Sequence, residues 1–293
     1  MKNVQRWSKM SIAVMCIIVG TLVIGKWGFS DTGEASQAVT PAGSSSTLVS
    51  PNTVGTSEPV GTSSGSTTSE SSGTSQASKE TKQLKEMKQP EGKVVYLTFD
   101  DGPSRLTDEF LDTLKQHDVT ATFFMQGSNL NVAGYHDEVK RAVDEGHYVG
   151  PHSMTHNYKK LYNQNEFVSE MKDTIDIIHN ITGVKPKLVR APYGSKPGLK
   201  DSLRNELAEA ELKLWDWTID SNDWKYTGNP GGIVNEVKTQ TTEDVEIVLL
   251  HEKQQTLDAL PEIIDFYKNK GYSFAVYKDE EHFPLNFWKD ERL

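Results

Sequence analysis

Short apolar runs alternate with amphipathic stretches through the last roughly 200 residues of this chain, and this alternation constrains the fold most. Seven runs rich in β-branched and aromatic residues are suited to buried strands: 94–99, 121–125, 147–150, 188–189, 212–219, 245–250 and 272–277. Six amphipathic stretches are suited to helices: 107–116, 136–145, 166–182, 199–211, 232–241 and 256–270. This order predicts βα units around a parallel sheet. We therefore expect an α/β fold, with a closed or nearly closed barrel favoured over an open doubly wound sheet.

The preceding stretch, 30–91, is dominated by Ser, Thr, Gly, Gln and charged residues and contains no aromatic residue. Such a composition cannot bury enough apolar surface to offset the entropy of ordering the chain. We expect a disordered stalk here and one folded domain over 92–293.

Residues 1–29 have a different pattern. Lys2, Arg6 and Lys9 precede an apolar run over 10–25, which Lys26 closes. Basic residues before an apolar run are typical of a signal peptide or signal anchor. The run is short for a spanning helix, which takes about 20 apolar residues, so retention and cleavage both remain open. We expect the domain on the extracellular face of the membrane or in the cell wall, anchored through this segment or secreted.

Charge and cysteine content argue against a nucleic-acid-binding protein and against a disulfide-stabilised domain. The net charge is -10 at pH 7, and no Lys/Arg cluster follows the first ten residues, which argues against a nucleic-acid partner. The single cysteine, Cys16, lies in the apolar run, so the exported domain contains no disulfide. We expect a monomer.

Polar side chains suited to chemistry stand at five of the expected strand ends. They are Asp100 and Asp101 after the first strand, His152 after the third, Arg190 after the fourth, Asp220 and Asp223 after the fifth, and His251 after the sixth. Active sites of barrel enzymes form at the C-terminal ends of strands, so these side chains are expected to share one site.

Three of these residues, together with His156, suggest a metal. Two carboxylates directly after a buried run, Asp100 and Asp101, need a cation or metal to compensate one of them. His152 and His156 stand four residues apart and share one face if their segment is helical. Joined to one Asp, they make a two-His, one-carboxylate set that leaves coordination positions open, as a catalytic metal requires.

Five short motifs of the sequence, taken together, resemble those of a known protein family. They are Thr-Phe-Asp-Asp-Gly at 98–102, His-Ser-x-x-His at 152–156, Arg-Ala-Pro-Tyr-Gly at 190–194, Asp-x-x-Asp-Trp at 220–224 and Leu-Leu-His at 249–251. In order and spacing, this set resembles the polysaccharide deacetylase family, also called the NodB-homology family or carbohydrate esterase family 4. The resemblance implies a distorted (β/α)7 barrel that hydrolyses N-acetyl or O-acetyl groups on polysaccharides with a divalent metal.

By the same resemblance, Asp101, His152 and His156 would hold the metal and Asp100 would be the general base. Zn2+ is expected first, with Co2+ as an alternative. The residue types fit, because a divalent metal polarises an acetyl carbonyl and makes water more acidic, so that a nearby carboxylate can take its proton.

The acid side of the reaction would depend on His251, which would protonate the leaving amine, a task suited to a side chain that titrates near neutrality. Asp223 resembles the family's partner to that histidine and would favour its protonated form. Arg190 would pair with a carboxylate of the site, with Asp100 as the first candidate.

Substrate contacts follow from the same motifs. The backbone N–H of Tyr193 would join the metal in binding the tetrahedral oxyanion. Trp224 and Leu249 would line an apolar slot for the acetyl methyl, although such residues beside strand ends are often core. Asp220 would orient a neighbour or cap a turn. Glu252, where many relatives have Asp, has no assigned task.

The remaining distinctive residues are read as structural. Phe283, Phe287 and Trp288 are expected to pack as a cap on the barrel rather than to form a carbohydrate platform. Five histidines without a motif are expected at the surface or in packing: His117, His136, His147, His179 and His282.

The leading interpretation is a peptidoglycan N-acetylglucosamine deacetylase, because a catalytic domain on a stalk of roughly 60 residues would work near its own cell wall. A deacetylase of chitin oligomers, poly-N-acetylglucosamine or acetylxylan stays open, as does a catalytically silent glycan-binding domain. The complete set of metal, base and acid candidates argues against the silent domain.

Overall fold

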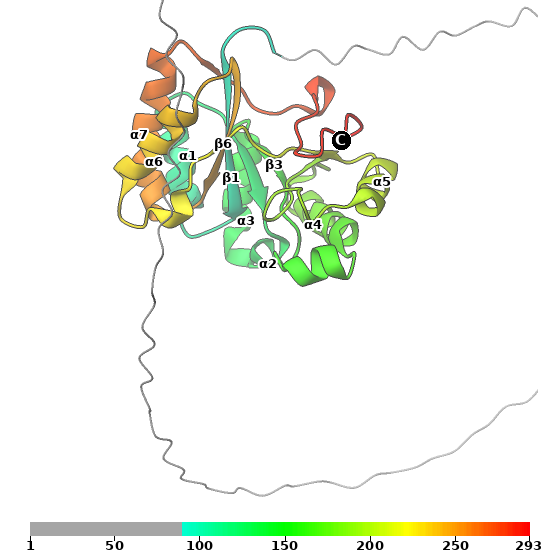
Figure 1. Cartoon of the computed structure of the whole chain (residues 1–293). Coiled ribbons are helices and arrows are strands. Elements are labelled where there is room, and N and C mark those ends of the chain that lie inside the picture. Colours follow the sequence, from blue (N-terminus) through cyan, green and yellow to red (C-terminus); the bar gives the residue numbers. More distant parts are fainter. Residues whose placement is uncertain (1–89) are drawn as a thin grey trace, which may run out of the picture. The chain divides into compact units, whose positions relative to one another are not determined.

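The computed structural model describes residues 90–293 (Figure 1), so the expected N-terminal segment and nearly all of the expected stalk lie outside the described residues. All strand pairs are parallel, and the main sheet has the order β3-β2-β1-β7-β6, with β8 pairing with the start of β1. Its strands are β1 (Val94–Gly102), β2 (Thr122–Met125), β3 (Tyr148–Pro151), β6 (Ile219–Asp220), β7 (Val245–His251) and β8 (Ser273–Phe274). A second sheet pairs β4 (Leu188–Val189) with β5 (Lys213–Leu214). The expected parallel α/β fold is confirmed.

The second sheet adjoins β3. The Arg190 N–H, just beyond the end of β4, donates to the carbonyl oxygen of Pro151, the last residue of β3, at 3.2 Å. A Cβ at Gly150 would come within 2.6 Å of the Leu188 carbonyl oxygen, so the close approach of these two strands requires glycine there. The strands thus follow one another as in a barrel wall, but ladder pairing is interrupted between β3 and β4.

The prediction of one strand over 212–219 is wrong, because this segment contains two short strands, β5 and the start of β6. Between them, Trp215 makes an isolated parallel bridge with Leu285, and the Asp216 N–H donates to the Leu285 carbonyl at 2.8 Å. The C-terminal segment therefore takes the pairing that a continuous strand would have used.

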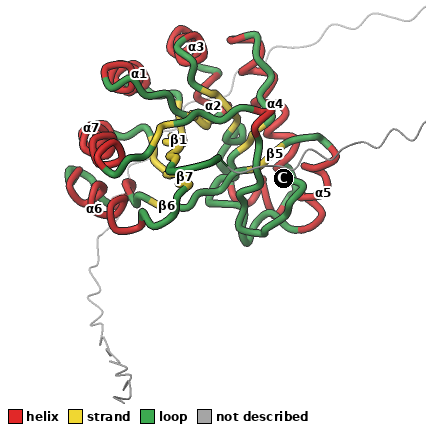
Figure 2. The backbone as a smooth tube through the Cα atoms, turned by 90° about the horizontal axis from the view of Figure 1, so that it is seen from above, coloured by secondary structure: helices red, strands yellow, loops and turns green. Residues whose placement is uncertain are grey.

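Helices surround the strands in the view from above (Figure 2). They are α1 (Thr107–Gln116), α2 (Gly127–Leu130), α3 (His136–Asp144), α4 (Phe167–Thr182), α5 (Asp201–Glu209), α6 (Pro230–Gln240) and α7 (Gln254–Asn269). The six expected helices agree with α1 and α3 to α7 within two residues at each end. The short α2, a π-helical turn over Lys159–Asn163, and 3-10 turns over Ala133–Tyr135, Asp223–Lys225 and Asp279–Glu281 were not expected. Within residues 90–293, no helix combines the length and hydropathy needed to cross a membrane.

The core that fixes the strand ends is aromatic. Phe99 of β1 stacks on Phe123 of β2 at 5.2 Å between ring centroids and meets Phe110 of α1 at 5.1 Å, and all three are fully buried. Burying such a side chain contributes about 1.5–3 kcal/mol. A second cluster holds the tail, where Phe283 is 2% exposed and its carbonyl accepts the Trp215 indole N–H at 2.8 Å.

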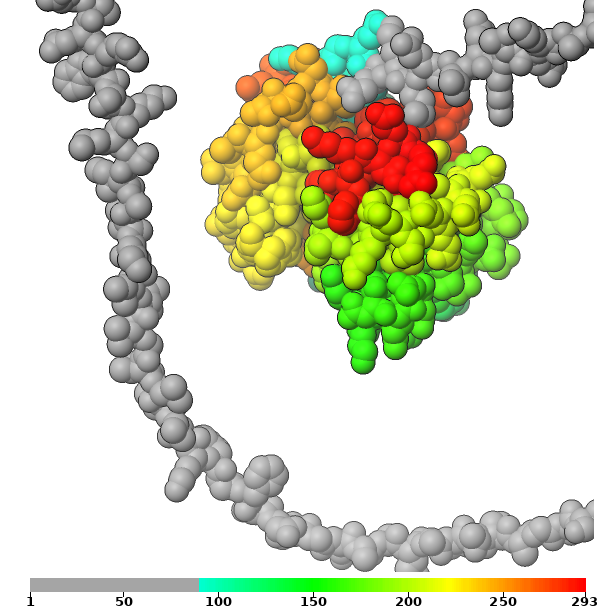
Figure 3. Space-filling model, turned by 45° about the vertical axis from the view of Figure 1, so that its right-hand side comes forward, coloured from blue at the N-terminus to red at the C-terminus, as the bar shows by residue number. Residues whose placement is uncertain are grey.

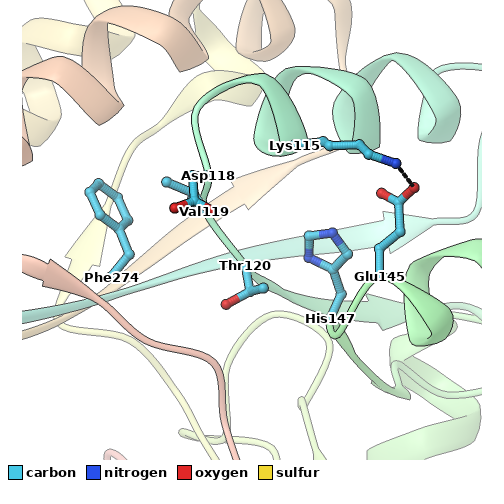
Figure 4. Close-up of a pocket in the computed structure, with 7 residues that line it drawn as sticks. All are labelled: Lys115, Asp118, Val119, Thr120, Glu145, His147 and Phe274. Carbon is cyan, nitrogen blue, oxygen red and sulfur yellow. Dashed lines mark hydrogen bonds and ion pairs between the residues drawn. The ribbon is translucent and has the colours of Figure 1, made fainter.

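A pocket of about 420 Å³ lies at the amino ends of β2 and β3 (Figure 4). Its buried His147 accepts the Ala121 N–H through Nδ1 at 3.0 Å, and burial lowers the pKa of His147 to about 4. The neighbouring Lys115 and Glu145 are already paired at 2.9 Å. His147 is therefore a neutral packing residue, and the polar residues of the motifs lie at the opposite ends of these strands.

Candidate active site

A pocket of about 490 Å³ lies at the carboxyl ends of the strands and gathers residues of all five motifs. Its walls are Asp100, Asp101, His152, His156, Ala191, Tyr193, Trp217, Asp220, Trp224, Leu249 and His251. The remaining two candidates, Arg190 and Asp223, are fully buried and contact Asp100 and His251.

The end of β1 turns two consecutive carboxylates toward this pocket. In a regular strand, successive side chains point to opposite faces. The register between β1 and β2 shifts between Asp100 and Gly102, and Asp101 has a φ of 71°. This irregularity lets both Asp100 and Asp101 line the pocket, which is a common use of a bulge. The Asn129 side-chain amide holds the turn by donating to the Asp101 carbonyl at 2.9 Å.

The two histidines come together without a helix. Ser153 and His156 have φ values of 63° and 51°, so 152–156 is a turn and the helical condition set out above is not met. The His156 N–H donates to Ser153 Oγ at 3.0 Å, and the Thr155 N–H donates to the buried Glu170 at 2.9 Å. These two bonds satisfy backbone N–H groups of the turn in place of helical hydrogen bonds.

Hydrogen bonds select which nitrogen of each histidine faces the pocket. His152 Nδ1 lies 3.0 Å from the Arg190 carbonyl oxygen, so it carries the proton. Tyr193 Oη donates to the His156 carbonyl at 2.8 Å and lies 3.1 Å from His156 Nδ1, which therefore donates to that oxygen. Both Nε2 atoms are left as acceptors, at 3.6 Å and 3.5 Å from Asp101 Oδ1. Such outer hydrogen bonds fix metal-binding tautomers.

Asp101, His152 and His156 fit a divalent metal. Each offers a donor atom within 4.8 Å of the others. Tetrahedral coordination at ~2.0–2.1 Å would bring donors to roughly 3.3 Å of one another, close to the separations found. Burial lowers the pKa of His152 and keeps it neutral. Burial opposes the charge on Asp101, but nearby positive charge, including that of His251 and Lys253, outweighs it and lowers the pKa of Asp101. Asp101 and His152 are thus in the protonation states that ligation requires.

Arg190 compensates the second carboxylate. Its Nη1 lies 3.3 Å from both oxygens of Asp100, its Nη2 donates to Thr98 Oγ1 at 3.1 Å, and its Nε donates to the Trp215 carbonyl at 2.6 Å. The guanidinium also lies 4.5 Å from the centre of the Phe124 ring. A fully buried cation is held only with such partners, and they fix the orientation of Asp100.

His251 is oriented by Asp223. Its Nδ1 lies 2.7 Å from Asp223 Oδ1, while Asp223 Oδ2 accepts the His251 N–H and the Thr256 hydroxyl, each at 2.7 Å. Nε2 is thereby left for the pocket. Burial disfavours the imidazolium, but Asp223, Asp100 and Asp101 outweigh it and raise the pKa of His251 above its ordinary value.

The turn after β4 presents a backbone donor. Tyr193 has a φ of 66°, and within residues 90–293 its N–H donates no hydrogen bond. Across the pocket wall, Leu249 is 5% exposed and Trp224 is 54% exposed, so Trp224 is not a core residue. Asp220 also lines the pocket, and its Oδ1 accepts the Asn222 N–H at 2.9 Å, which caps the turn.

The chain is similar to known proteins that share a described family. The family described as polysaccharide deacetylase matches residues 87–215. A peptidoglycan-N-acetylglucosamine deacetylase of Bacillus cereus is 52% identical over 209 residues, which cover 69% of this chain and 76% of that protein. The chain belongs to the polysaccharide deacetylase family. The family resemblance and the enzyme class predicted from the five motifs are confirmed.

Two further deacetylases are similar to this chain in sequence or structure. A peptidoglycan-N-acetylmuramic acid deacetylase of Bacillus subtilis is 38% identical over 194 residues, covering 66% of this chain and 39% of that protein. The crystal structure of a polysaccharide deacetylase from Bacillus cereus superposes with a TM-score of 0.67 at 51% identity, covering 69% of this chain and all of the other.

Three residues of the deacetylase site were not found from the sequence. Ala191 and Trp217 line the pocket, and the neighbouring Asp216 is fully buried. Asp216 Oδ1 accepts the Ser195 N–H at 2.8 Å, and its Oδ2 accepts the Ser195 hydroxyl at 2.6 Å. A carboxylate inside the apolar run Leu-Trp-Asp-Trp at 214–217 was the available signal.

Proposed function

We propose that this deacetylase removes N-acetyl groups from N-acetylglucosamine residues of peptidoglycan. The observation that carries the chemistry is the gathering of three metal donors, a carboxylate and a histidine around one pocket. The choice of polymer is supported by relatives named for peptidoglycan substrates.

Asp101, His152 and His156 would hold the metal, with Zn2+ as our first choice. When bound, this ion acts as a Lewis acid toward the acetyl carbonyl and makes water more acidic. The two imidazole nitrogens and one carboxylate oxygen are a common zinc donor set, and three protein ligands leave room for substrate.

Asp100 would act as general base by taking a proton from the attacking water. Arg190, whose Nη1 lies 3.3 Å from Asp100 Oδ1, holds this carboxylate in place. As the new C–O bond forms and the C–N bond breaks, His251 would give its Nε2 proton to the leaving nitrogen. The products are acetate and a free amine on the sugar. The hydrogen bond to Asp223 keeps the imidazole oriented for this transfer.

Tyr193 would stabilise the transition state through its backbone N–H, which makes no other hydrogen bond within residues 90–293. Leu249 and Trp224, both in the pocket wall, would hold the acetyl methyl. Removing one such oxyanion donor typically costs about 10²–10³-fold in turnover.

We extend the proposal to architecture and location. Residues 92–293 would form the catalytic domain, a distorted (β/α)7 barrel whose distortion is the interrupted pairing on both sides of β4 and β5. Residues 1–29 would direct export and serve as anchor or cleaved signal, with 30–91 as the stalk, so that a monomeric enzyme works at the cell wall. The basic residues before the apolar run support this orientation.

The test is acetate release. Purified protein loaded with Zn2+ or Co2+ is incubated with peptidoglycan, chitooligosaccharides and acetylxylan, with Asp100→Asn as the inactive control. We expect the highest kcat/KM on peptidoglycan. A preference for one of the other two polymers would replace the proposed substrate, and glycan binding without acetate release would favour the silent domain.

A further inference from the structure

We propose that Phe287, together with Trp217, forms a ledge that binds a second sugar ring of the glycan chain beside the acetyl pocket. This inference rests on the proposed function, because it assumes a polymeric substrate. It also corrects the expectation that the whole aromatic tail serves as a cap. Phe283 does so at 2% exposure, whereas Phe287 is 40% exposed.

Phe287 is held in place by its backbone. Its N–H donates to the buried Asp216 Oδ2 at 2.6 Å, and the neighbouring Trp288 indole donates to the Ser195 carbonyl at 3.0 Å. Asn286 and Asp290 close the segment with bonds of 2.8 Å and 2.9 Å. These residues belong to the C-terminal segment, drawn in red on the surface in Figure 3. An exposed aromatic ring on a fixed backbone loses little entropy when a ligand covers it.

The ledge is continuous with the pocket. The rings of Phe287 and Trp217 meet edge to face at 5.1 Å between centroids, and Trp217 is part of the pocket wall. Gly194 has a φ of 78°, and a Cβ there would stand 3.1 Å from each of these two rings. Both rings therefore close in on the turn that also carries Tyr193, so a ligand leaving the pocket on this side meets the ledge.

Trp288 is excluded as the sugar-binding ring. Arg204 lies 4.4 Å and Lys196 lies 5.1 Å from its ring centre, so two cations occupy it, whereas Trp217 has one, Arg190 at 5.5 Å. Phe287 has Trp217 as its ring partner and otherwise keeps open surface. Exposed apolar surface beside a pocket is typical of a ligand-binding site.

The chemistry of a glycan fits this surface. A pyranose ring carries hydroxyls at its edge and C–H bonds on its faces, and such a face packs on an aromatic ring. The pocket, at about 490 Å³, is in the range that holds one small ligand, so a longer glycan must continue over the rim. The ledge would take a neighbouring sugar and favour chains over a single acetylated unit.

The test compares Phe287→Ala, Phe287→Leu and Phe287→Trp. Leu keeps apolar volume but lacks an aromatic face, whereas Trp keeps the face. We expect Ala and Leu to lower kcat/KM for tetra-N-acetylchitotetraose, relative to that for 4-nitrophenyl acetate, by about three- to tenfold, mainly through KM. Trp should restore most of the ratio. Val184→Ala, a change of an exposed residue in the loop after α4, is the control and should leave the ratio unchanged.

A second readout needs no turnover. In an Asp100→Asn background, the dissociation constant for the same tetrasaccharide is measured by calorimetry, and Phe287→Ala should raise it by about three- to tenfold. Equal losses on the tetrasaccharide and the small ester, an unchanged dissociation constant, or no tetrasaccharide binding would overturn the ledge. If the wild-type protein releases no acetate from any of the glycans but Phe287→Ala still weakens tetrasaccharide binding, the proposed function is overturned and the ledge stands.

Discussion

His251 Nδ1 lies 2.7 Å from Oδ1 of the fully buried Asp223, and this pair determines the pH range in which the proposed acid can work. Burial alone would lower the pKa of His251, but Asp223 leads the charges that raise it. Because an acid must be protonated to act, activity is lost as pH rises through this pKa. The raised value therefore extends activity toward higher pH.

We predict that Asp223→Asn moves the alkaline limb of the kcat/KM profile to lower pH, since the amide removes the charge that favours the imidazolium. The acid limb should move less, because Asp100 keeps its partner Arg190. The rate at the optimum should fall by about tenfold or more. The measurement is the pH dependence of kcat/KM, and an unmoved alkaline limb would remove Asp223 from this role.

Asp100→Asn tests the general base. The amide is nearly isosteric but cannot take a proton, so kcat should fall by at least about 10²-fold while KM changes little. Metal content, measured by atomic absorption, should stay at the wild-type level because Asp101, His152 and His156 are intact. Asp173→Asn on the exposed face of α4 is the matched control. Near-wild-type acetate release by Asp100→Asn would refute the assignment.

Metal binding can be tested through the Tyr193 hydroxyl, which is not one of the proposed metal donors. Tyr193→Phe removes the oxygen that bonds His156 Nδ1 and the His156 carbonyl, and loss of such a partner typically weakens metal binding by about 10–100-fold. His156→Ala should weaken it further. Chelation should abolish acetate release in the wild type, and added Zn2+ should restore it. Full activity of a chelated, metal-free sample would contradict the metal site.

The sequence was sufficient to predict which residues meet at the strand ends. It was not sufficient to predict the backbone conformation around them. His251, Arg190 and Asp100 stand after apolar runs, so their meeting at one edge follows from a parallel sheet. The break in 212–219 depends on Leu285, about 70 residues later, and no local pattern contains that contact. The positive φ at Asp101 and the turn that joins His152 to His156 depend equally on distant hydrogen bonds.

Glu252 gives the clearest case of a residue that the sequence left without a role. Its Oε2 accepts the Ser104 and Thr107 hydroxyls at 2.7 Å and 2.6 Å, which ties the loop after β7 to the turn after β1. Within residues 90–293 its Oε1 finds no partner, and this atom lies 1.9 Å from where a Cβ on Gly102 would stand. Glu252 is thus a buried carboxyl that positions the Asp100–Asp101 turn.

Burial raises the pKa of Glu252 from 4.5 to about 7, although the two hydroxyls oppose the shift. A carboxyl whose folded pKa is raised contributes stability that is fully present below its unfolded pKa and is lost as pH rises through the folded value. The free energy of unfolding should therefore fall between pH 4.5 and 7, by roughly 3 kcal/mol at most, and Glu252→Gln should remove that part of the fall. Urea unfolding of chelated wild-type and variant protein at pH 5 and pH 8 measures it. Glu209→Gln on the exposed surface of α5 should leave the difference between the two pH values unchanged. If wild type and Glu252→Gln lose equal stability from pH 5 to pH 8, Glu252 is ionised throughout this range and its pKa is not raised in the folded protein.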